Sequence, residues 1–254
     1  MTPPEQKTGI DGQYRDLWGA RVLITGGAQG IGAAIVAAFT RQGSKVAFLD
    51  LAQEAGEAVA EATGATFRCV DLTDVAATRE VVSALIDESG PFQVLVNNAA
   101  WDERHAIADT TVELWDRVQA VNLRHQFFVT QAVLPTMEPG ASIVNLSSTS
   151  YLLGVTGMPG YIAAKAGITG MSRSLARELG PRGIRVNAVL PGWVMTERQR
   201  AKWVTDAALA ATLKAQCLPV EIQPEDVPPL VLFLASDASR MITGQALAVD
   251  AGVT

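Results

Sequence analysis

The chain has 254 residues, of which 48% are hydrophobic and 18% are charged, and a sequence of this composition can bury a large core, unlike a disordered one. Its 20 lysines and arginines against 26 aspartates and glutamates give a formal net charge of −6, which argues against binding nucleic acid through a net basic surface. The longest apolar runs, such as residues 230–235, fall far short of the ~20 residues that cross a bilayer. We therefore expect a globular protein with no nucleic-acid partner and no membrane segment.

The first 17 residues contain two prolines and charges of both signs, without the apolar core of a secretory signal. We expect residues 1–17 to form a flexible arm and the protein to be cytoplasmic. Cys69 and Cys217 stand far apart in the chain, so we expect ordinary thiols and no disulfide scaffold. His105 and His125 share no metal-ligand spacing with each other or with the cysteines, and we expect no metal site.

Short runs rich in Val, Ile, Leu and Phe alternate along the chain with longer alanine-rich segments of helical periodicity. The predicted strands are residues 20–25, 45–50, 65–70, 92–97, 141–147, 183–190 and 245–250, and the predicted helices are residues 30–42, 52–62, 74–89, 111–136, 159–179 and 224–236. Because the strands are almost uniformly apolar, the pattern indicates a single α/β domain over residues 18–254, with a doubly wound, seven-stranded parallel sheet and helices on both faces. The irregular segment 191–223 is expected to form a substrate lid over the carboxyl ends of the strands.

A glycine-rich turn, TGGAQGIG at residues 25–32, follows the first predicted strand and opens the first helix. Gly26 permits a tight turn, Gly30 lets the backbone approach a pyrophosphate, and Gly32 lets the helix and strand pack closely. The helix N-terminus offers unpaired N–H groups to the phosphates. The turn therefore predicts a single-domain Rossmann fold that binds a dinucleotide, although a strand-to-helix turn can also need glycine for steric reasons alone.

Asp50 ends the second predicted strand, 20 residues after Gly30. A carboxylate at this place accepts hydrogen bonds from the ribose hydroxyls of the adenosine and repels a 2′-phosphate. Residues 26–32 contain no lysine or arginine, and none directly follows Asp50. We predict NAD as the cofactor in preference to NADP. The alternative is that Asp50 caps the helix that follows it.

Tyr161 and Lys165 are four residues apart on a predicted helix and so lie on one face, where the ammonium group should lower the pKa of the phenol. Ser148 follows the fifth strand, 13 residues before Tyr161, and can hold the reacting oxygen. We predict that Tyr161 removes the proton of a substrate hydroxyl while hydride leaves for the nicotinamide. Each residue also has an ordinary structural interpretation, as part of an amphipathic helix for the Tyr–Lys pair, as a turn residue for Ser148 and as a helical amide for Asn122.

These motifs together resemble the short-chain dehydrogenase/reductase family over residues 18–254. The resemblance is carried by TGGAQGIG, Asp71 in CVDL, NNAA at 97–100, Asn122, Ser148, YIAAK at 161–165, Pro191-Gly192 and Thr196. Ala100 departs from the family's usual glycine. The resemblance implies that Asn122, Ser148, Tyr161 and Lys165 are catalytic, with Asn122 in a proton relay with Lys165. It implies a cofactor site made of Gly26, Gln29, Gly30, Ile31, Asp50, Leu51, Asp71, Leu72, Asn98, Ala99, Tyr161, Lys165, Pro191, Gly192, Val194 and Thr196. It also implies a homotetramer that packs through helices 111–136 and 159–179 and through the C-terminal strand region.

Three further stretches, AWDERH at 100–105, NLRHQFF at 122–128 and PGWVMTERQ at 191–199, resemble bacterial sugar dehydrogenases, especially aldose 1-dehydrogenases such as D-xylose dehydrogenase. A polyol needs hydrogen-bond partners and an apolar platform, whereas a steroid or fatty-acyl pocket is lined mainly by aliphatic groups. Polar and aromatic residues near the predicted site also include Asp102, Arg198, Gln199 and Trp203. The candidate substrate-binding residues are Trp101, Ser148, Ser150, Tyr151 and Trp193, although ordinary loop surface is an alternative for each.

Other functions stay open. The substrate could be a sugar acid or a 2-keto-3-deoxy sugar acid that is oxidised at a secondary alcohol, with its carboxylate bound by Arg104 or Arg198. The protein could also reduce a ketone or a 3-oxoacyl thioester. A different class is a non-catalytic NAD-binding regulator, since fold does not fix function, but such a protein would not need Ser148, Tyr161 and Lys165 together.

Overall fold

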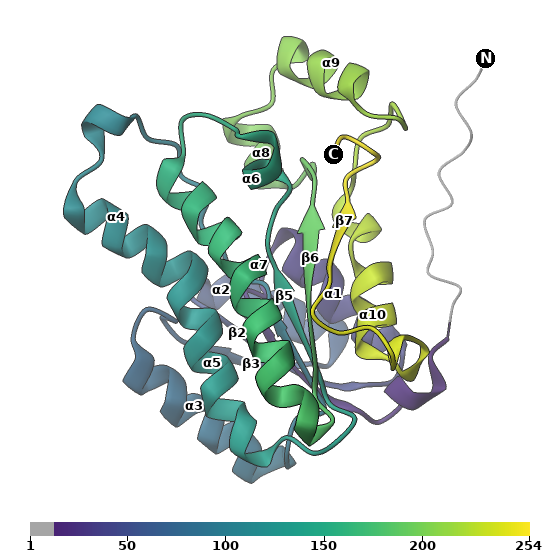
Figure 1. The fold of residues 1–254 in the computed structure, drawn as a ribbon. Coiled ribbons are helices and arrows are strands. Elements are labelled where there is room, and N and C mark those ends of the chain that lie inside the picture. The colour runs from purple at the N-terminus through teal and green to yellow at the C-terminus, as the bar shows by residue number, and fades with distance from the viewer. Residues whose placement is uncertain (1–12) are drawn as a thin grey trace.

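The computed structural model describes residues 13–254 and contains the predicted seven-stranded parallel sheet (Figure 1). The strand order is β3-β2-β1-β4-β5-β6-β7. The strands are β1 (Arg21–Thr25), β2 (Lys45–Asp50), β3 (Thr66–Cys69), β4 (Val94–Asn97), β5 (Ser142–Leu146), β6 (Arg185–Pro191) and β7 (Ala246–Val249). The α-helices are α1 (Gly30–Arg41), α2 (Gln53–Thr63), α3 (Val75–Ser89), α4 (Val112–Gln119), α5 (His125–Val133), α6 (Ser150–Leu153), α7 (Pro159–Leu179), α8 (Glu197–Lys202), α9 (Asp206–Ala215) and α10 (Pro228–Ala235).

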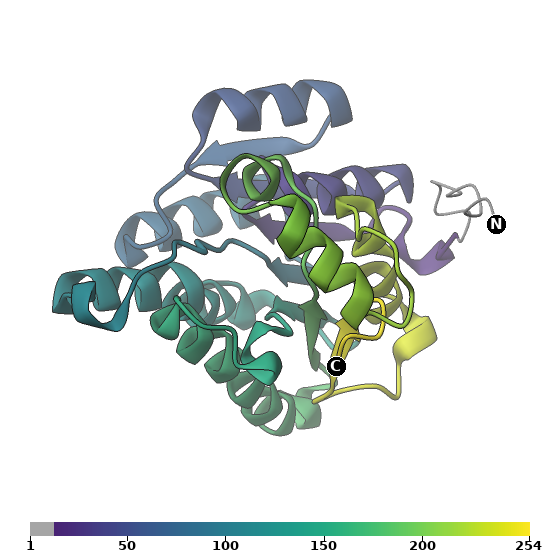
Figure 2. The ribbon, with the colours of Figure 1, turned by 90° about the horizontal axis from the view of Figure 1, so that it is seen from above.

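Both faces of the sheet are covered by helices, which explains why its strands are apolar along their whole length. In β1, Val22 and Ile24 point to one face, where α1 and α10 complete the core, with α2 beside them. Leu23 points to the other face, where α3, α5 and α7 complete a second core. Seen from above, the two groups of helices lie on either side of the sheet (Figure 2). The predicted Rossmann fold is confirmed.

The chain reverses its direction of travel across the sheet between β1 and β4. It runs from β1 outward through β2 to β3, and then crosses to β4 on the other side of β1. At such a switch point the connections leave the neighbouring strands in opposite directions, and a crevice opens at the carboxyl ends of the strands. Thr25 and Asn97 are the last residues of the two strands that border it.

The helix predicted at 111–136 is not continuous. The structure divides it into α4, a π-helical segment at Ala120–Arg124, α5 and a 3-10 turn at Leu134–Thr136. A single π-helical turn adds one residue to the helix, and a phase shift of one residue is too small to separate from the ordinary scatter of apolar positions in one sequence. Its centre is Asn122, one of the predicted site residues.

The predicted arm at residues 1–17 is also shorter than expected. Residues 1–12 lie outside the described residues, but residues 13–17 pack on the core: Leu17 is only 2% exposed. The Tyr14 backbone N–H donates to Gln42 Oε1 at 2.8 Å, and the Ser44 hydroxyl donates to the Leu17 carbonyl at 2.8 Å. The expectation of a flexible arm was therefore wrong for residues 13–17.

The segment 191–223 leaves the end of β6, carries α8 and α9 above the carboxyl ends of the strands (Figure 1), and is joined to itself by a bridge between Val194 and Ile222.

Within residues 13–254, no helix combines the length and the apolar character that a membrane crossing needs. In the same range, no three His, Cys, Asp or Glu side chains gather as ligands of a metal ion.

Polar side chains are buried beneath the carboxyl ends of the central strands. Asn97 of β4 donates through Nδ2 to Asn145 Oδ1 of β5 at 2.9 Å, and Asn145 Nδ2 donates to Ser172 Oγ of α7 at 2.9 Å. His125, at the start of α5, is 1% exposed, and neither ring nitrogen has a partner in hydrogen-bonding geometry. Burial, with a further contribution from the charge of Lys165, lowers the pKa of His125 to about 3.

We predict that His125 makes the protein sensitive to acid. Its ordinary pKa is 6.5, so between pH 6.5 and about 3 the unfolded chain binds a proton that the folded chain excludes. The stability that depends on the neutral ring is complete above pH 6.5 and falls by roughly 1.4 kcal/mol for each pH unit below it. In urea titrations at pH 6.5 and pH 4.5, a His125→Leu variant should lose about 2–3 kcal/mol less than the wild type. Equal losses in the two proteins would contradict this role of the buried ring.

Candidate active site

The glycine-rich turn has the steric demands that the sequence predicted. Gly26 and Gly30 have φ angles of +72° and +53°, which L side chains rarely adopt. A Cβ atom on Gly32 would lie 1.7 Å from the Gly26 carbonyl oxygen, so only glycine lets α1 begin this close to β1. Gln29, the N-cap of α1, makes no side-chain cap, which leaves the first-turn N–H groups available to a ligand.

Asp50 and Asn98 hold this turn in place. Asp50 Oδ2 accepts the Ala28 N–H at 2.9 Å, and its Oδ1 accepts the Ala52 N–H at 3.0 Å. Ala52, and not Asp50, is the N-cap residue of α2, so the capping alternative was wrong. Asn98 Nδ2 donates to the carbonyls of Thr25 and Gly26 at 3.1 and 2.8 Å. The Asp50 and Asn98 side chains, both expected at the cofactor site, therefore also support the backbone of the glycine-rich turn.

A single large cleft runs along the carboxyl ends of the strands. Its volume is about 1660 Å³, which exceeds the ~300–1000 Å³ of a pocket for one small ligand and so leaves room for a dinucleotide beside a substrate. Every residue predicted to bind the cofactor lines this cleft. Of the other predicted residues, Asn122 and Tyr151 do not line it, whereas Trp101, Ser148, Ser150 and Trp193 do. Tyr151 lies on the short helix α6, next to Ser150, and its assignment to the substrate site stays a prediction.

Tyr161, Ser148 and Lys165 meet in the middle of the cleft. The Ser148 side chain lies close enough to the Tyr161 hydroxyl to favour the ionised phenol. Ser148 Oγ also accepts the N–H and the hydroxyl of Ser150 at 3.1 and 2.8 Å, so its own proton is left to donate. Lys165 is 1% exposed, its Nζ lies 5.4 Å from the centre of the Tyr161 ring, and it donates to the Leu146 carbonyl at 2.9 Å.

The pKa values of this group differ from the expectation. Burial, followed by the negative charge of Asp102, raises the pKa of Tyr161 above its usual range, and the Ser148 hydrogen bond only partly opposes the shift. Burial also lowers the pKa of Lys165 to about 7, against the opposing effect of Asp102. The prediction that Lys165 lowers the pKa of Tyr161 was therefore wrong for the protein alone, because desolvation acts on both groups and weakens the ammonium form itself.

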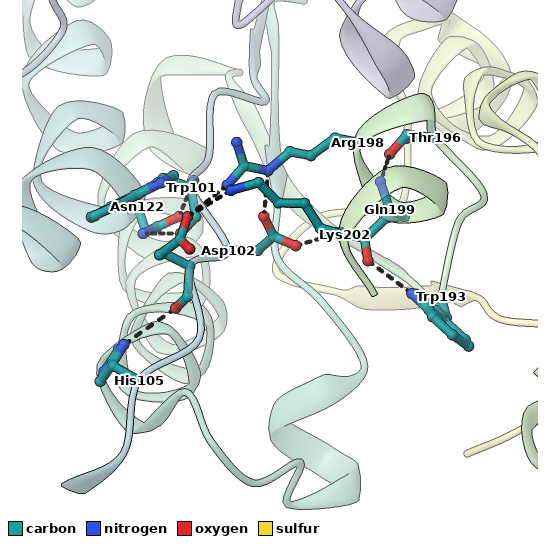
Figure 3. Close-up of polar contacts among 10 residues, drawn as sticks. Trp101, Asp102, His105, Asn122, Trp193, Thr196, Arg198, Gln199 and Lys202 are labelled. Atoms are coloured by element: carbon teal, nitrogen blue, oxygen red, sulfur yellow. Dashed lines mark hydrogen bonds and ion pairs between the residues drawn. The ribbon is translucent and has the colours of Figure 1, made fainter. Parts of the chain in front are cut away.

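Asn122 does not contact Lys165 through its side chain. Its Oδ1 accepts the Trp101 N–H at 2.8 Å, and its Nδ2 donates to the carbonyls of Trp101 and Val118 at 3.0 and 2.9 Å. The amide is completely buried and holds Trp101, in the loop that follows β4 (Figure 3). The side chain thus positions Trp101 in the wall of the cleft, and the relay with Lys165 that the family resemblance implies stays a prediction.

Charged and aromatic side chains surround the end of the cleft near Tyr161. Arg198 Nε donates to Asp102 Oδ1 at 2.9 Å, and the Gln199 amide joins Trp193 to Asp102 (Figure 3). The Arg104 guanidinium lies 4.3 Å from the centre of the Trp203 ring, and that of Arg117 lies 5.0 Å from the Trp101 ring. Sequence reasoning missed Arg117 because α4 brings it to the cleft from a position with no recognisable motif.

The cleft fits a nicotinamide dinucleotide. The uncapped start of α1, with glycines at 26, 30 and 32, forms a cradle that side chains would fill. The Asp50 carboxylate lies at the end of β2, where ribose hydroxyls are bound in this type of fold. The residues that would hold such a cofactor and those around Tyr161 share one cleft.

Comparison with known proteins agrees with this arrangement. A family model described as enoyl-(acyl carrier protein) reductase matches residues 26–254. A probable galactose dehydrogenase of Rhizobium meliloti is 48% identical over 249 residues, which are 95% of this chain and 97% of that protein. D-xylose 1-dehydrogenase of Caulobacter vibrioides is 48% identical over 246 residues, with 94% and 97% covered. The ligand-free aldohexose dehydrogenase of Thermoplasma acidophilum superposes with a TM-score of 0.87 at 27% identity, with 94% and 96% of the two chains covered.

These two relatives align with nearly the whole chain at well above 30% identity, and the family model matches all of the chain after residue 25. The fold, the glycine turn and the Ser–Tyr–Lys group give the same assignment independently. The chain is a member of the short-chain dehydrogenase/reductase family.

Proposed function

We propose that the protein is an NAD-dependent dehydrogenase that removes hydride from C1 of an aldose and leaves the lactone, with Tyr161 as the general base. The observation that carries the proposal is the gathering of Ser148, Tyr161 and Lys165 in one cleft whose nearby walls are polar and aromatic. Two relatives at 48% identity are described as a galactose dehydrogenase and a D-xylose 1-dehydrogenase. Polar and aromatic walls suit a sugar better than a steroid or a fatty-acyl chain.

In this proposal Ser148, Tyr161 and Lys165 each have a separate role in moving the proton of the sugar hydroxyl. Ser148 donates its free O–H to the reacting oxygen, and Tyr161 accepts the proton of the sugar hydroxyl. Lys165, whose pKa of about 7 lets it gain or lose a proton near neutrality, carries the proton away from the phenol side. NAD, when bound, accepts the hydride and adds positive charge to the cleft.

The choice of NAD follows from the adenosine end of the cleft. Asp50 places a carboxylate there, and its two oxygens already accept the N–H groups of Ala28 and Ala52. Among the described residues, this end is lined by Leu51, Asp71 and Leu72, with no lysine or arginine beside them to neutralise a 2′-phosphate. Cys69 and Cys217 are both free thiols. Free thiols are compatible with a cytoplasmic enzyme, because the cytosol keeps them reduced.

A substrate screen tests the proposal. Aldoses, sugar acids and polyols are offered with NAD and, separately, with NADP, and formation of the reduced cofactor is followed by absorbance. We expect an aldose to be oxidised to its lactone, with kcat/KM for NAD at least about tenfold above that for NADP, equivalent to ~1.4 kcal/mol. A clear preference for NADP would contradict the role of Asp50, and no turnover of any sugar would contradict the proposed substrate class.

A sugar acid is a second candidate that one observation favours. Arg104 lines the cleft and stacks on Trp203, and within residues 13–254 no carboxylate pairs with it. Arg198, the other arginine considered for this task, is occupied by Asp102 and Glu103. If sugar acids are the better substrates in the screen, Arg104 is the group that we expect to bind the carboxylate.

The Tyr161→Phe variant tests the base. Removing the phenol oxygen should lower kcat by about 10³-fold, within the usual range for a general base, while the affinity for NADH, measured by fluorescence titration, changes little. Because the pKa of Tyr161 is raised, the wild-type rate should increase with pH through the alkaline range, and the residual rate of the variant should not. Tyr14→Phe, which changes a tyrosine that packs against the core and does not line the cleft, is the matched control and should remain active. An active Tyr161→Phe enzyme would refute the mechanism.

We also propose a homotetramer that packs through α4, α5 and α7 across one twofold axis and through the C-terminal strand region across another. Val112, Trp115 and Phe127 are exposed on α4 and α5, where large apolar side chains are costly in a monomer. Light scattering should give a mass near four times 26.8 kDa, and Trp115→Glu should shift the mass to a smaller species. A wild-type monomer would overturn the proposal.

A further inference from the structure

Gln199 connects the two loops that border the substrate end of the cleft. Its backbone is fixed in the first turn of α8, because its N–H donates to the Oγ1 of the N-cap residue, Thr196, at 3.2 Å. Its side-chain Oε1 accepts the Trp193 indole N–H at 2.9 Å, and its Nε2 donates to Asp102 Oδ2. Figure 3 shows the amide between these two partners, one on the segment after β6 and the other on the loop after β4.

An amide is the side chain that this connection requires. The indole N–H of Trp193 can only donate, and the carboxylate of Asp102 can only accept. A bridge between them needs an acceptor and a donor in one short group. A carboxylate at position 199 would serve Trp193 but repel Asp102, and an aliphatic side chain would serve neither.

Both partners line the cleft beside Tyr161 and have few other restraints. No hydrogen bond besides the one to Gln199 is made by the Trp193 side chain in the described part of the chain. The Asp102 carboxylate is held by Gln199 at one oxygen and by Arg198 at the other. The position of this carboxylate matters for the chemistry, because its charge acts on both Tyr161 and Lys165.

We propose that Gln199 is a positioning residue that fixes the sugar pocket by holding the Trp193 ring and the Asp102 carboxylate in register across the cleft. The ring then forms the apolar platform, and the remaining lone pairs of the carboxylate accept sugar hydroxyls. This inference rests on the proposed function, since it assumes a sugar substrate. Gln199 itself takes no part in proton or hydride transfer.

The kinetic experiment compares Gln199→Leu and Gln199→Glu with wild type. Both variants should raise KM for the preferred sugar by about tenfold or more, as expected when a hydrogen bond to a charged group is lost, while KM for NAD stays within about threefold. Arg200→Ala is the matched control: Arg200 is the next residue of α8, pairs with Glu221 and does not line the cleft. Its sugar KM should equal that of wild type. An unchanged sugar KM in both Gln199 variants, or an equal rise in KM for NAD, would overturn the proposal.

A double variant tests the bridge itself. In Gln199→Glu combined with Asp102→Asn, the donor and acceptor exchange places, and the local net charge is the same as in wild type. The amide at position 102 then donates to the carboxylate at 199, which still accepts the indole N–H. We expect the sugar KM to fall at least about threefold below that of Gln199→Glu alone, because one charge-assisted hydrogen bond is restored. A double variant no better than the single one would count against a positioning role.

A spectroscopic readout separates this inference from the proposed function. The protein has five tryptophans, and the indole ¹H–¹⁵N signal of Trp193 is assigned by its loss in Trp193→Phe. Gln199→Leu should shift this signal upfield, whereas Gln199→Glu, which keeps the acceptor, and Arg200→Ala should leave it downfield. If wild type oxidises no sugar, the proposed function fails, and this signal alone decides whether Gln199 holds Trp193. A signal that Gln199→Leu does not move would overturn the bridge.

Discussion

The cleft depends on one cluster of hydrogen bonds, made where β1 and β4 end and the chain changes direction. Thr25 Oγ1 accepts the N–H groups of Asn98 and Ala99, and Asn98 Nδ2 returns two bonds to the carbonyls of Thr25 and Gly26. These contacts hold the two strand ends together while the backbones diverge above them. The glycine turn lies on one side of these hydrogen bonds and the segment of the β4 loop from Trp101 onward lies on the other, so the two ends of the cleft keep a fixed spacing.

Burial then shapes the chemistry of the groups placed around those hydrogen bonds. The apolar core beneath the sheet excludes water from Lys165 and His125, which raises the cost of charging either. The partners of Lys165 are a backbone carbonyl and an aromatic ring, with no carboxylate in direct contact. Burial lowers the pKa of Lys165 to about 7, whereas a solvent-exposed lysine stays protonated at neutral pH. The same burial makes the charged form of Lys165 less favourable in the folded protein than in the unfolded chain.

Local pattern was sufficient for the strands, the cofactor cradle and the Ser–Tyr–Lys group, because each is encoded by short-range spacing or by the need for glycine. It was insufficient wherever contacts join distant segments. The π-helical segment at Ala120–Arg124 shifts the helical phase by only one residue, and the attachment of Asn122 to Trp101 spans 21 residues of sequence. The bridge from Gln199 to Asp102 spans 97. The upward pKa shift of Tyr161 also needed the structure, since spacing shows the nearby ammonium group but not the depth of burial.

The attachment of Trp101 to Asn122 through both of its backbone groups divides the loop after β4 into two parts that can evolve separately. The part of the loop before Trp101 is held by Thr25 and the glycine-rich turn, through Asn98 and Ala99. Residues beyond it are constrained mainly by α8, through Asp102 and Glu103. Exchanging residues 102–105 together with α8 would keep the ion pairs that join them, but the Asp102 carboxylate would have to be retained, because its charge acts on both Tyr161 and Lys165. The buried amide of Asn122 sets the other boundary of such an exchange, since it fixes Trp101 through both backbone groups.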